Sequence, residues 1–332
     1  MQNEEPTQKK KLNGTQITHI IFGIIMLVII TIGAIQLIRW NKGREFLIDE
    51  NINVDTETED YVFYMDPAIY DGENYDGQLD ILILGNDTVA YDKDGSSIGD
   101  MIAEQTGATV YNCAFEGSYL SSVSNHWTKV LDHNPIDAYS FFWLNNGIFA
   151  NNFDMQERAL DMLPEGYDRQ HYEETLNLLK SVDFNSIDLL LIYYDGHDYL
   201  EQRPINNPFD MFDVTTMEGS FTGTYERYPT TYPHMQHMFI APTFCYVTHE
   251  NGAKEGCDTA NLGHGNLPTC LTTLQVQSQN YDVSYLDNYY GININTETGD
   301  KYLMADGITP TREGREMIAN RISDYISART NN

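Results

Sequence analysis

The sequence has 332 residues, 41% of them hydrophobic, which is enough for one sizeable core and one large domain. Lys and Arg total 19 against 49 Asp and Glu, so the formal net charge is −30. A field of this sign repels phosphate backbones, and it excludes nucleic acid from the expected partners.

The N-terminal part of the chain differs in charge from the rest. Residues 1–44 hold six basic and two acidic residues, whereas residues 45–332 hold 13 basic and 47 acidic residues. The stretch IIFGIIMLVIITIGAIQLI (20–38) is uncharged and about long enough for a membrane-spanning helix. Its apolar run is longer than that of a signal peptide, and no small-residue cleavage site is evident.

These features predict a single-pass protein of the cell membrane. We expect a short cytoplasmic tail at 1–18, a transmembrane anchor at 19–39 and an extracellular C-terminal domain. Residues 40–78 are acidic and irregular, and they predict a juxtamembrane linker that settles onto that domain. The membrane is therefore the first expected partner.

From residue 79 onward, strand and helix signals alternate. The predicted strands are LDILILG (79–85), ATVYNCAF (108–115), the first part of IDLLLIYYDGHDYL (187–200), HMFIAPTFCYV (237–247) and VSYLDNYY (283–290). The predicted helices include SSIGDMIAEQTG (96–107), PIDAYSFFWLNNGIF (135–149), YEETLNLLKSV (172–182) and TREGREMIANRISDYISA (311–328). This alternation predicts a five-stranded parallel sheet covered on both faces, a three-layer α/β/α sandwich over residues 79–330.

In such sheets the ligand binds beyond the C-terminal ends of the strands. The loops expected there contain ILILGND, TGATVYNCAFEGS, LLLIYYDGHDY and DGITPTREGREMIA. In order, spacing and context they resemble the SGNH (GDSL-type) hydrolases, a family of esterases, lipases and carbohydrate deacetylases. The resemblance covers about residues 79–327 and implies the flavodoxin-like sandwich of that family.

The resemblance also implies a four-residue catalytic set that this sequence keeps only in part. The nucleophilic serine position falls on Asp87, and the oxyanion-hole glycine falls on Gly117. The oxyanion-hole asparagine position falls on His197. The closing Asp-x-x-His motif gives Asp306 and then Thr309, where the general-base histidine is expected.

A serine esterase needs a hydroxyl group and an adjacent imidazole that removes its proton. Neither is present at these positions, and no histidine follows His264. We therefore expect a catalytically degenerate relative, without a cofactor, that retains a cleft for a glycan or an acylated carbohydrate of the cell envelope. Two alternatives remain: an active ester hydrolase or deacetylase with rearranged or metal-assisted chemistry, and a structural envelope protein.

Each replaced residue also has a purely structural interpretation. Asp87 is suited to cap a helix after its turn, His197 to be a polar loop residue, and Thr309 to turn the chain into the last helix. If the loops converge, Asp87, His197 and Asp306 share one pocket and could hold a divalent cation. These residues come from three separate loops without a metal-binding spacing, so we expect no metal.

The chain also contains four cysteines. Cys113 lies in an apolar strand pattern that predicts a buried thiol. Cys257 and Cys270 lie in one loop rich in Gly and Asn, and outside the membrane they could form a disulfide.

Overall fold

The computed structural model describes residues 58–330 and scattered residues between His19 and Gly33. The chain divides into two compact units, residues 1–55 and residues 56–332. The predicted tail, most of the predicted anchor and the first part of the predicted linker lie outside the described residues. Among the residues that are described, no helix combines the length and the apolar character needed to cross a membrane.

A five-stranded parallel sheet forms the centre of the second unit, as the sequence predicts. The strands are β1 (Asp80–Gly85), β2 (Thr109–Asn112), β3 (Leu189–Tyr193), β4 (Gln236–Ile240) and β7 (Ser284–Leu286). Their order is β2-β1-β3-β4-β7, and all neighbouring strands are parallel. Because β1 and β3 are neighbours near the middle of the sheet, the turns that follow them lie side by side.

Alternate side chains of each strand pack on opposite faces of the sheet, which makes two separate cores. Ile81 and Ile83 of β1 belong to one buried cluster, and Leu82 and Leu84 belong to the other. Helices α4 (Ile98–Thr106) and α15 (Arg312–Thr330) cover the first face. The other face is covered by α5 (Trp127–His133), α6 (Phe141–Ala150), α7 (Asp154–Asp161), α8 (Arg169–Ser181), α10 (Met217–Tyr225) and α12 (Leu267–Asn280).

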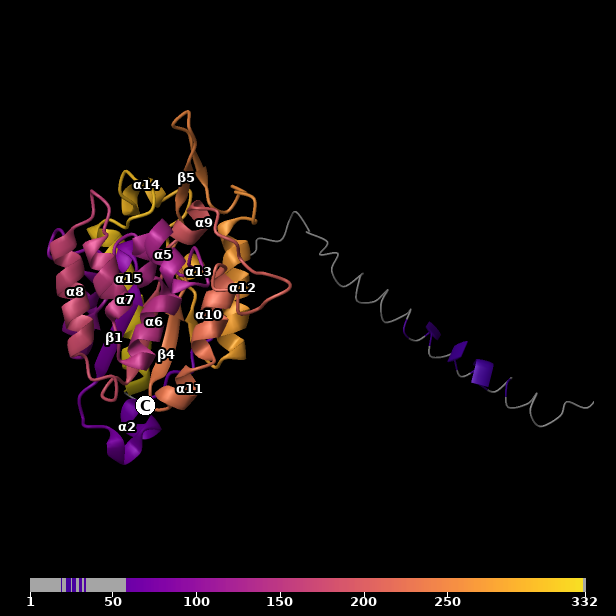
Figure 1. The fold of residues 1–332 in the computed structure, drawn as a ribbon, viewed down its shortest axis with the longest axis horizontal. Coiled ribbons are helices and arrows are strands. Elements are labelled where there is room, and N and C mark those ends of the chain that lie inside the picture. Colours follow the sequence, from indigo (N-terminus) through magenta and orange to yellow (C-terminus); the bar gives the residue numbers. More distant parts are fainter. Residues whose placement is uncertain are drawn as a thin grey trace, which may run out of the picture. The chain divides into compact units, whose positions relative to one another are not determined.

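Short helices connect these elements and mark the two ends of the sheet. They are α2 (Pro67–Tyr70), η1 (Gly72–Asn74), α3 (Asp87–Ala90), η2 (Pro135–Tyr139), α9 (His197–Leu200), α11 (Tyr228–Thr231), α13 (Asn288–Gly291) and α14 (Gly299–Tyr302). Figure 1 shows α9 and α14 at one end of the sheet and α2 and α11 at the other. The result is an α/β/α sandwich with a distinct C-terminal and N-terminal edge.

Two predicted elements are divided in the structure. The predicted strand 237–247 is too long: β4 ends at Ile240, and the chain then leaves the sheet. The chain next forms an antiparallel hairpin of β5 (Tyr246–Thr248) and β6 (Lys254–Gly256). Pro242 lies between β4 and β5 and has no N–H to donate to a ladder.

The predicted helix 135–149 is interrupted at Ser140, whose extended backbone separates η2 from α6.

Cys257 and Cys270, which the sequence allows to form a disulfide, are not bonded to each other in the structure. All four cysteines are buried free thiols. Cys257 lies beside Cys245 at the base of the β5–β6 hairpin, where its Sγ accepts a hydrogen bond from the Cys245 amide at 3.2 Å. The Cys270 thiol instead lies 3.7 Å from the carbonyl oxygen of Asn266 on its own helix.

Residues 58–78 pack against the sandwich. Tyr61 forms an antiparallel bridge with Tyr285 of the edge strand β7. Asp60 accepts hydrogen bonds from the Arg321 guanidinium on α15, and the Tyr64 ring is 1% exposed. This segment therefore covers one sheet edge and forms part of the domain.

A buried guanidinium on the last helix binds the loop that precedes α4. Arg315 is fully buried and donates to the carbonyl oxygens of Ser96 at 3.0 Å and Pro310 at 2.8 Å. It also bonds the Asp94 carboxylate, and it lies over the Tyr91 ring at 4.4 Å. Two backbone carbonyls depend on this side chain for their hydrogen bonds.

We expect Arg315→Leu to lower the free energy of unfolding by about 3 kcal/mol, because the carbonyls of Ser96 and Pro310 would remain buried without donors. Chemical denaturation of the full-length protein measures this. The matched control is Arg312→Leu, since Arg312 is exposed on the same helix and pairs only with Glu316. Its effect should stay within about 0.5 kcal/mol; equal effects of the two substitutions would contradict the expectation.

Candidate functional site

A polar cavity of about 360 Å³ lies at the C-terminal edge of the sheet. Four of the five site residues predicted from the sequence line it: Asp87, His197, Asp306 and Thr309. The fifth, Gly117, reaches the site through its backbone amide. The loops expected to converge therefore do so.

Asp87 is the first residue of α3, directly after the turn that ends β1. Its Oδ2 accepts the Gly117 amide hydrogen at 2.8 Å. The same oxygen lies 3.9 Å from Nδ1 of His197. The carboxylate thus binds the amide of Gly117, the residue that the sequence resemblance assigns to the oxyanion hole.

Gly117 can be replaced by no other residue without strain. Its φ is +72°, and a Cβ at this position would lie 2.6 Å from the Tyr167 ring. A side chain would therefore meet both an unfavourable backbone conformation and a steric clash. The glycine keeps its amide pointed at the position of residue 87.

The sequence analysis missed the residue that holds this site together, Asp195. Its Oδ1 lies 2.6 Å from Nδ1 of His197 and accepts a hydrogen bond from Asn86 Nδ2 at 2.8 Å. Its Oδ2 accepts from Thr88 Oγ1 at 2.9 Å. The Asp195 side chain is 4% exposed, so these donors replace the water that the carboxylate loses.

A second missed acid, Asp198, joins the same loop to the loop of Gly117. Its two carboxylate oxygens accept the backbone amides of Leu120 and Ser121 at 2.8 and 2.9 Å, and it also accepts from the Ser121 hydroxyl. In the motif that the chain resembles, an acid follows the asparagine position. The stretch DGHDY therefore carried a signal for Asp198, whereas Asp195 falls on a position where the motif has glycine.

The charges of the three central groups depend on one another. Burial raises the pKa of Asp87 to about 6, and the nearby Asp195 carboxylate adds to that increase. Burial by itself would lower the pKa of His197, but the adjacent Asp195 carboxylate outweighs burial and raises it to about 10. His197 is therefore an imidazolium at neutral pH, located between two carboxylates.

Asp306 and Thr309 form a turn at the rim of the cavity. Asp306 Oδ1 accepts the backbone amides of Ile308 and Thr309, each at 3.0 Å. Asp306 therefore does not belong to the metal-ligand set suggested by the sequence. The described groups with mutually close ligand atoms, all within 4.8 Å, are Asp87, Asp195 and His197.

The charge of the cavity is strongly negative. Its acidic lining residues are Asp87, Asp92, Glu116, Asp168 and Asp306, and its other ionisable lining residues include Lys93, His171 and His197. Lys93 is already paired with Glu116 at 3.2 Å. The cavity therefore repels anions and favours neutral or cationic ligands.

Comparison with known proteins finds similarity only among solved structures. No protein-family model and no curated protein matches the chain. One solved structure has 16% sequence identity and a TM-score of 0.51, covering 76% of this chain and 97% of the other. A possible lipase from Chitinophaga pinensis (14% identity, TM-score 0.44, 76% and 98% covered) and a lipase/acylhydrolase from Enterococcus faecalis (12%, 0.42, 76% and 97%) are also similar.

These likenesses concern the fold and not the activity. The structure with a TM-score of 0.51 supports the arrangement of a five-stranded parallel sheet with flanking helices.

The imidazolium state of His197 can be tested directly. We expect its ring to stay protonated through pH 8 in NMR titrations of the full-length protein, because Asp195 raises its pKa to about 10. In Asp195→Asn the ring should become neutral by about pH 8. Asp87→Asn should have a smaller effect, since Asp87 is 3.9 Å from Nδ1 whereas Asp195 is 2.6 Å away; a neutral ring at pH 7 in the wild type would refute this assignment.

Asp87 should reduce stability above its pKa. A folded-state pKa of about 6, above the unfolded value, means that its contribution is fully present below about pH 4 and is lost as the pH rises through about 6. We therefore expect Asp87→Asn to raise the free energy of unfolding by about 1–2 kcal/mol at pH 8 and by almost nothing below pH 4. Denaturation at several pH values tests this, with Asp92→Asn on the exposed rim as the control.

Proposed function

We propose that this chain is a membrane-anchored, extracytoplasmic protein with an SGNH-type fold that binds its ligand without serine-esterase chemistry. The proposed ligand is a neutral or cationic glycan, or another component of the cell envelope. The observation that carries the proposal is the hydrogen bond from the Gly117 amide to Asp87 at 2.8 Å. A carboxylate at this position competes directly with any oxyanion for the same donor.

The residues at the nucleophile and base positions support the same conclusion. Asp87 stands at the serine position, and Thr309 lines the cavity at the histidine position. His197 is held as an imidazolium by Asp195, so it cannot accept a proton from a hydroxyl at neutral pH. Removing nucleophile and base from such a unit costs roughly a factor of 10⁶ in rate.

The class of ligand follows from the size and charge of the cavity. A volume of about 360 Å³ is in the range of small-ligand pockets and accommodates a sugar ring. Several carboxylates face the cavity and can accept hydrogen bonds from sugar hydroxyls or from an amino group. Anionic carbohydrates are disfavoured by the same residues.

The predicted topology is part of this proposal. The uncharged stretch 20–38 motivates the anchor, and the excess of acidic residues after residue 45 is compatible with an exposed domain. An outside location makes envelope glycans the available ligands.

Metal-assisted hydrolysis is the second candidate, favoured by the proximity of Asp87, Asp195 and His197. Two carboxylates and an imidazole suit a divalent cation. However, the Asp195 oxygens already accept hydrogen bonds from Asn86, Thr88 and His197. A cation would have to displace the imidazole proton and at least one of these bonds.

One set of measurements on the full-length protein in nanodiscs separates the candidates. We expect no labelling by a fluorophosphonate probe, no hydrolysis of an aryl acetate, and binding to neutral or amino-bearing glycans on an array. Thr309→Trp, which fills the cavity, should weaken that binding at least about tenfold. Thr272→Trp, an exposed position on α12, is the matched control and should change nothing.

Two results would contradict the proposal. The first is stoichiometric labelling of any serine, which would reveal a nucleophile. The second is aryl-acetate hydrolysis that appears only with added Zn²⁺ and disappears in His197→Ala, which would support the metal-assisted candidate.

A further inference from the structure

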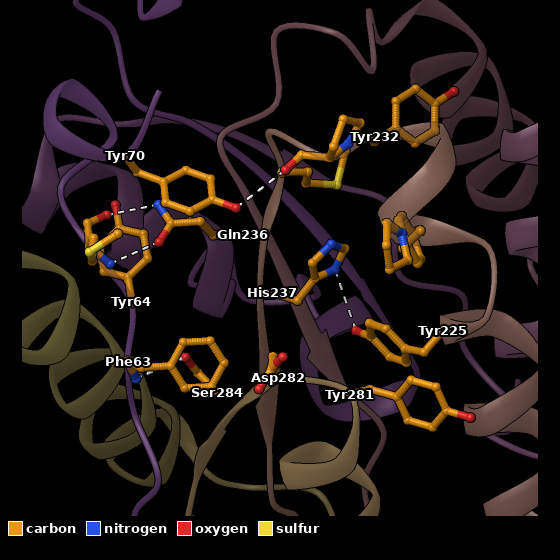
Figure 2. Close-up of a pocket in the computed structure, with 15 residues that line it drawn as sticks. Phe63, Tyr64, Tyr70, Tyr225, Tyr232, Gln236, His237, Tyr281, Asp282 and Ser284 are labelled. Carbon is orange, nitrogen blue, oxygen red and sulfur yellow. Dashed lines mark hydrogen bonds between the residues drawn. The ribbon is translucent and has the colours of Figure 1, made fainter. Parts of the chain in front are cut away.

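A second cavity, of about 270 Å³, lies at the opposite edge of the sheet from the polar cavity. Its wall includes Gln236 and Ser284, the first residues of β4 and β7. Residues of the segment before β1 close one side, where Met65 exchanges two hydrogen bonds with Gln236 at 2.8 Å each. Figure 2 shows this arrangement.

Aromatic rings dominate the wall of this cavity. The lining rings include Phe63, Tyr70, Tyr225, Tyr228, Tyr232 and Tyr281. The rings of Tyr225 and Tyr281 lie 6.1 Å apart, and those of Tyr225 and Tyr228 lie 5.5 Å apart. Tyr70 is fixed by its hydroxyl, which donates to the Pro233 carbonyl oxygen. The wall is therefore a set of ordered π faces and edges from three distant parts of the chain.

No lysine or arginine is among the described residues that line this cavity. The one basic-type side chain is His237, whose Nδ1 lies 3.4 Å from the Tyr225 hydroxyl (Figure 2). Burial lowers the pKa of His237 to about 3, so the ring is neutral at physiological pH. The cavity wall therefore carries no positive charge.

Carboxylates surround the aromatic wall. Asp282 lines the cavity, and Tyr281 donates its hydroxyl to Glu226 at 2.9 Å. Burial is the main cause that raises the pKa of Tyr64 and Tyr232, and nearby carboxylates add to it: Asp188 and Asp66 at Tyr64, and Asp183 at Tyr232. The electrostatic potential in the cavity is therefore negative from several sides.

We propose that this cavity is a binding site for an organic ammonium group, of which a quaternary, choline-like group is the best match. Aromatic faces attract cations through the ring quadrupole, and a quaternary ammonium suits such a wall because it requires no hydrogen-bond acceptors. The carboxylate of Asp282 in the wall and the carboxylates around it strengthen the attraction. This site is independent of the glycan cleft of the proposed function, and either proposal can fail alone.

Titration calorimetry of the full-length protein in nanodiscs free of choline lipids tests the site. We expect choline and tetramethylammonium to bind with dissociation constants below about 1 mM. The neutral isostere 3,3-dimethyl-1-butanol, which has the same shape, should bind at least about tenfold more weakly. Phosphocholine should also bind more weakly than choline, because its phosphate meets the carboxylates; the reverse order would identify a phosphocholine group as the natural ligand and overturn the choice of a bare ammonium.

Variants of two partly exposed rings locate the site. Tyr281→Leu and Tyr232→Leu should each weaken choline binding about tenfold, whereas Tyr281→Phe, which keeps the ring, should leave it within about twofold. Thr309→Trp in the other cavity should have no effect. Equal binding of choline and its neutral isostere, or no binding of either at about 10 mM, would overturn the proposal, and neither result depends on how well a variant folds.

Discussion

The buried carboxylate of Asp195 sets the geometry of the candidate site. It accepts hydrogen bonds from Asn86 and Thr88 in the turn after β1, and it holds His197 in the turn after β3. The Asp195 amide returns a hydrogen bond to the Asn86 side chain at 2.8 Å. A carboxylate this deeply buried is tolerated only when its oxygens are matched by donors. The two turns are therefore held in one arrangement, and the positions of Asp87 and His197 follow from it.

The substitutions at the esterase positions are physically coupled. An aspartate at position 87 beside Asp195 would place two negative charges together with little water to screen them. His197 supplies the compensating positive charge, because both carboxylates raise its pKa. A charged Asp87 would be less favourable there without His197. The site thus has a consistent charge arrangement of its own.

Much of the fold could be predicted, because β1, β3 and β7 are apolar runs that end at or just before a glycine or an acidic residue. The fourth strand, which was predicted too long, shows the limit. The apolar residues between Ile240 and Tyr246 are buried outside the sheet, and burial alone gives no strand signal.

Comparison with a motif found His197 but not Asp195, because the importance of Asp195 comes from donors more than 100 residues away. Likewise, the aromatic cavity joins residues 63–70, 225–237 and 281–284, which no local pattern connects.

The two cavities select ligands by the same physical means, although their walls differ. At the C-terminal edge, carboxylates line the cavity directly and can accept hydrogen bonds. At the N-terminal edge, aromatic rings form most of the wall, Asp282 is part of it, and Glu226 is bonded to the lining residue Tyr281. Residues 45–332 hold 47 acidic and 13 basic residues, so the field of the whole domain reinforces both local arrangements. If both cavities bind ligands as proposed, the acidity of this chain disfavours anions at each of them and contributes to selection as well as to solubility.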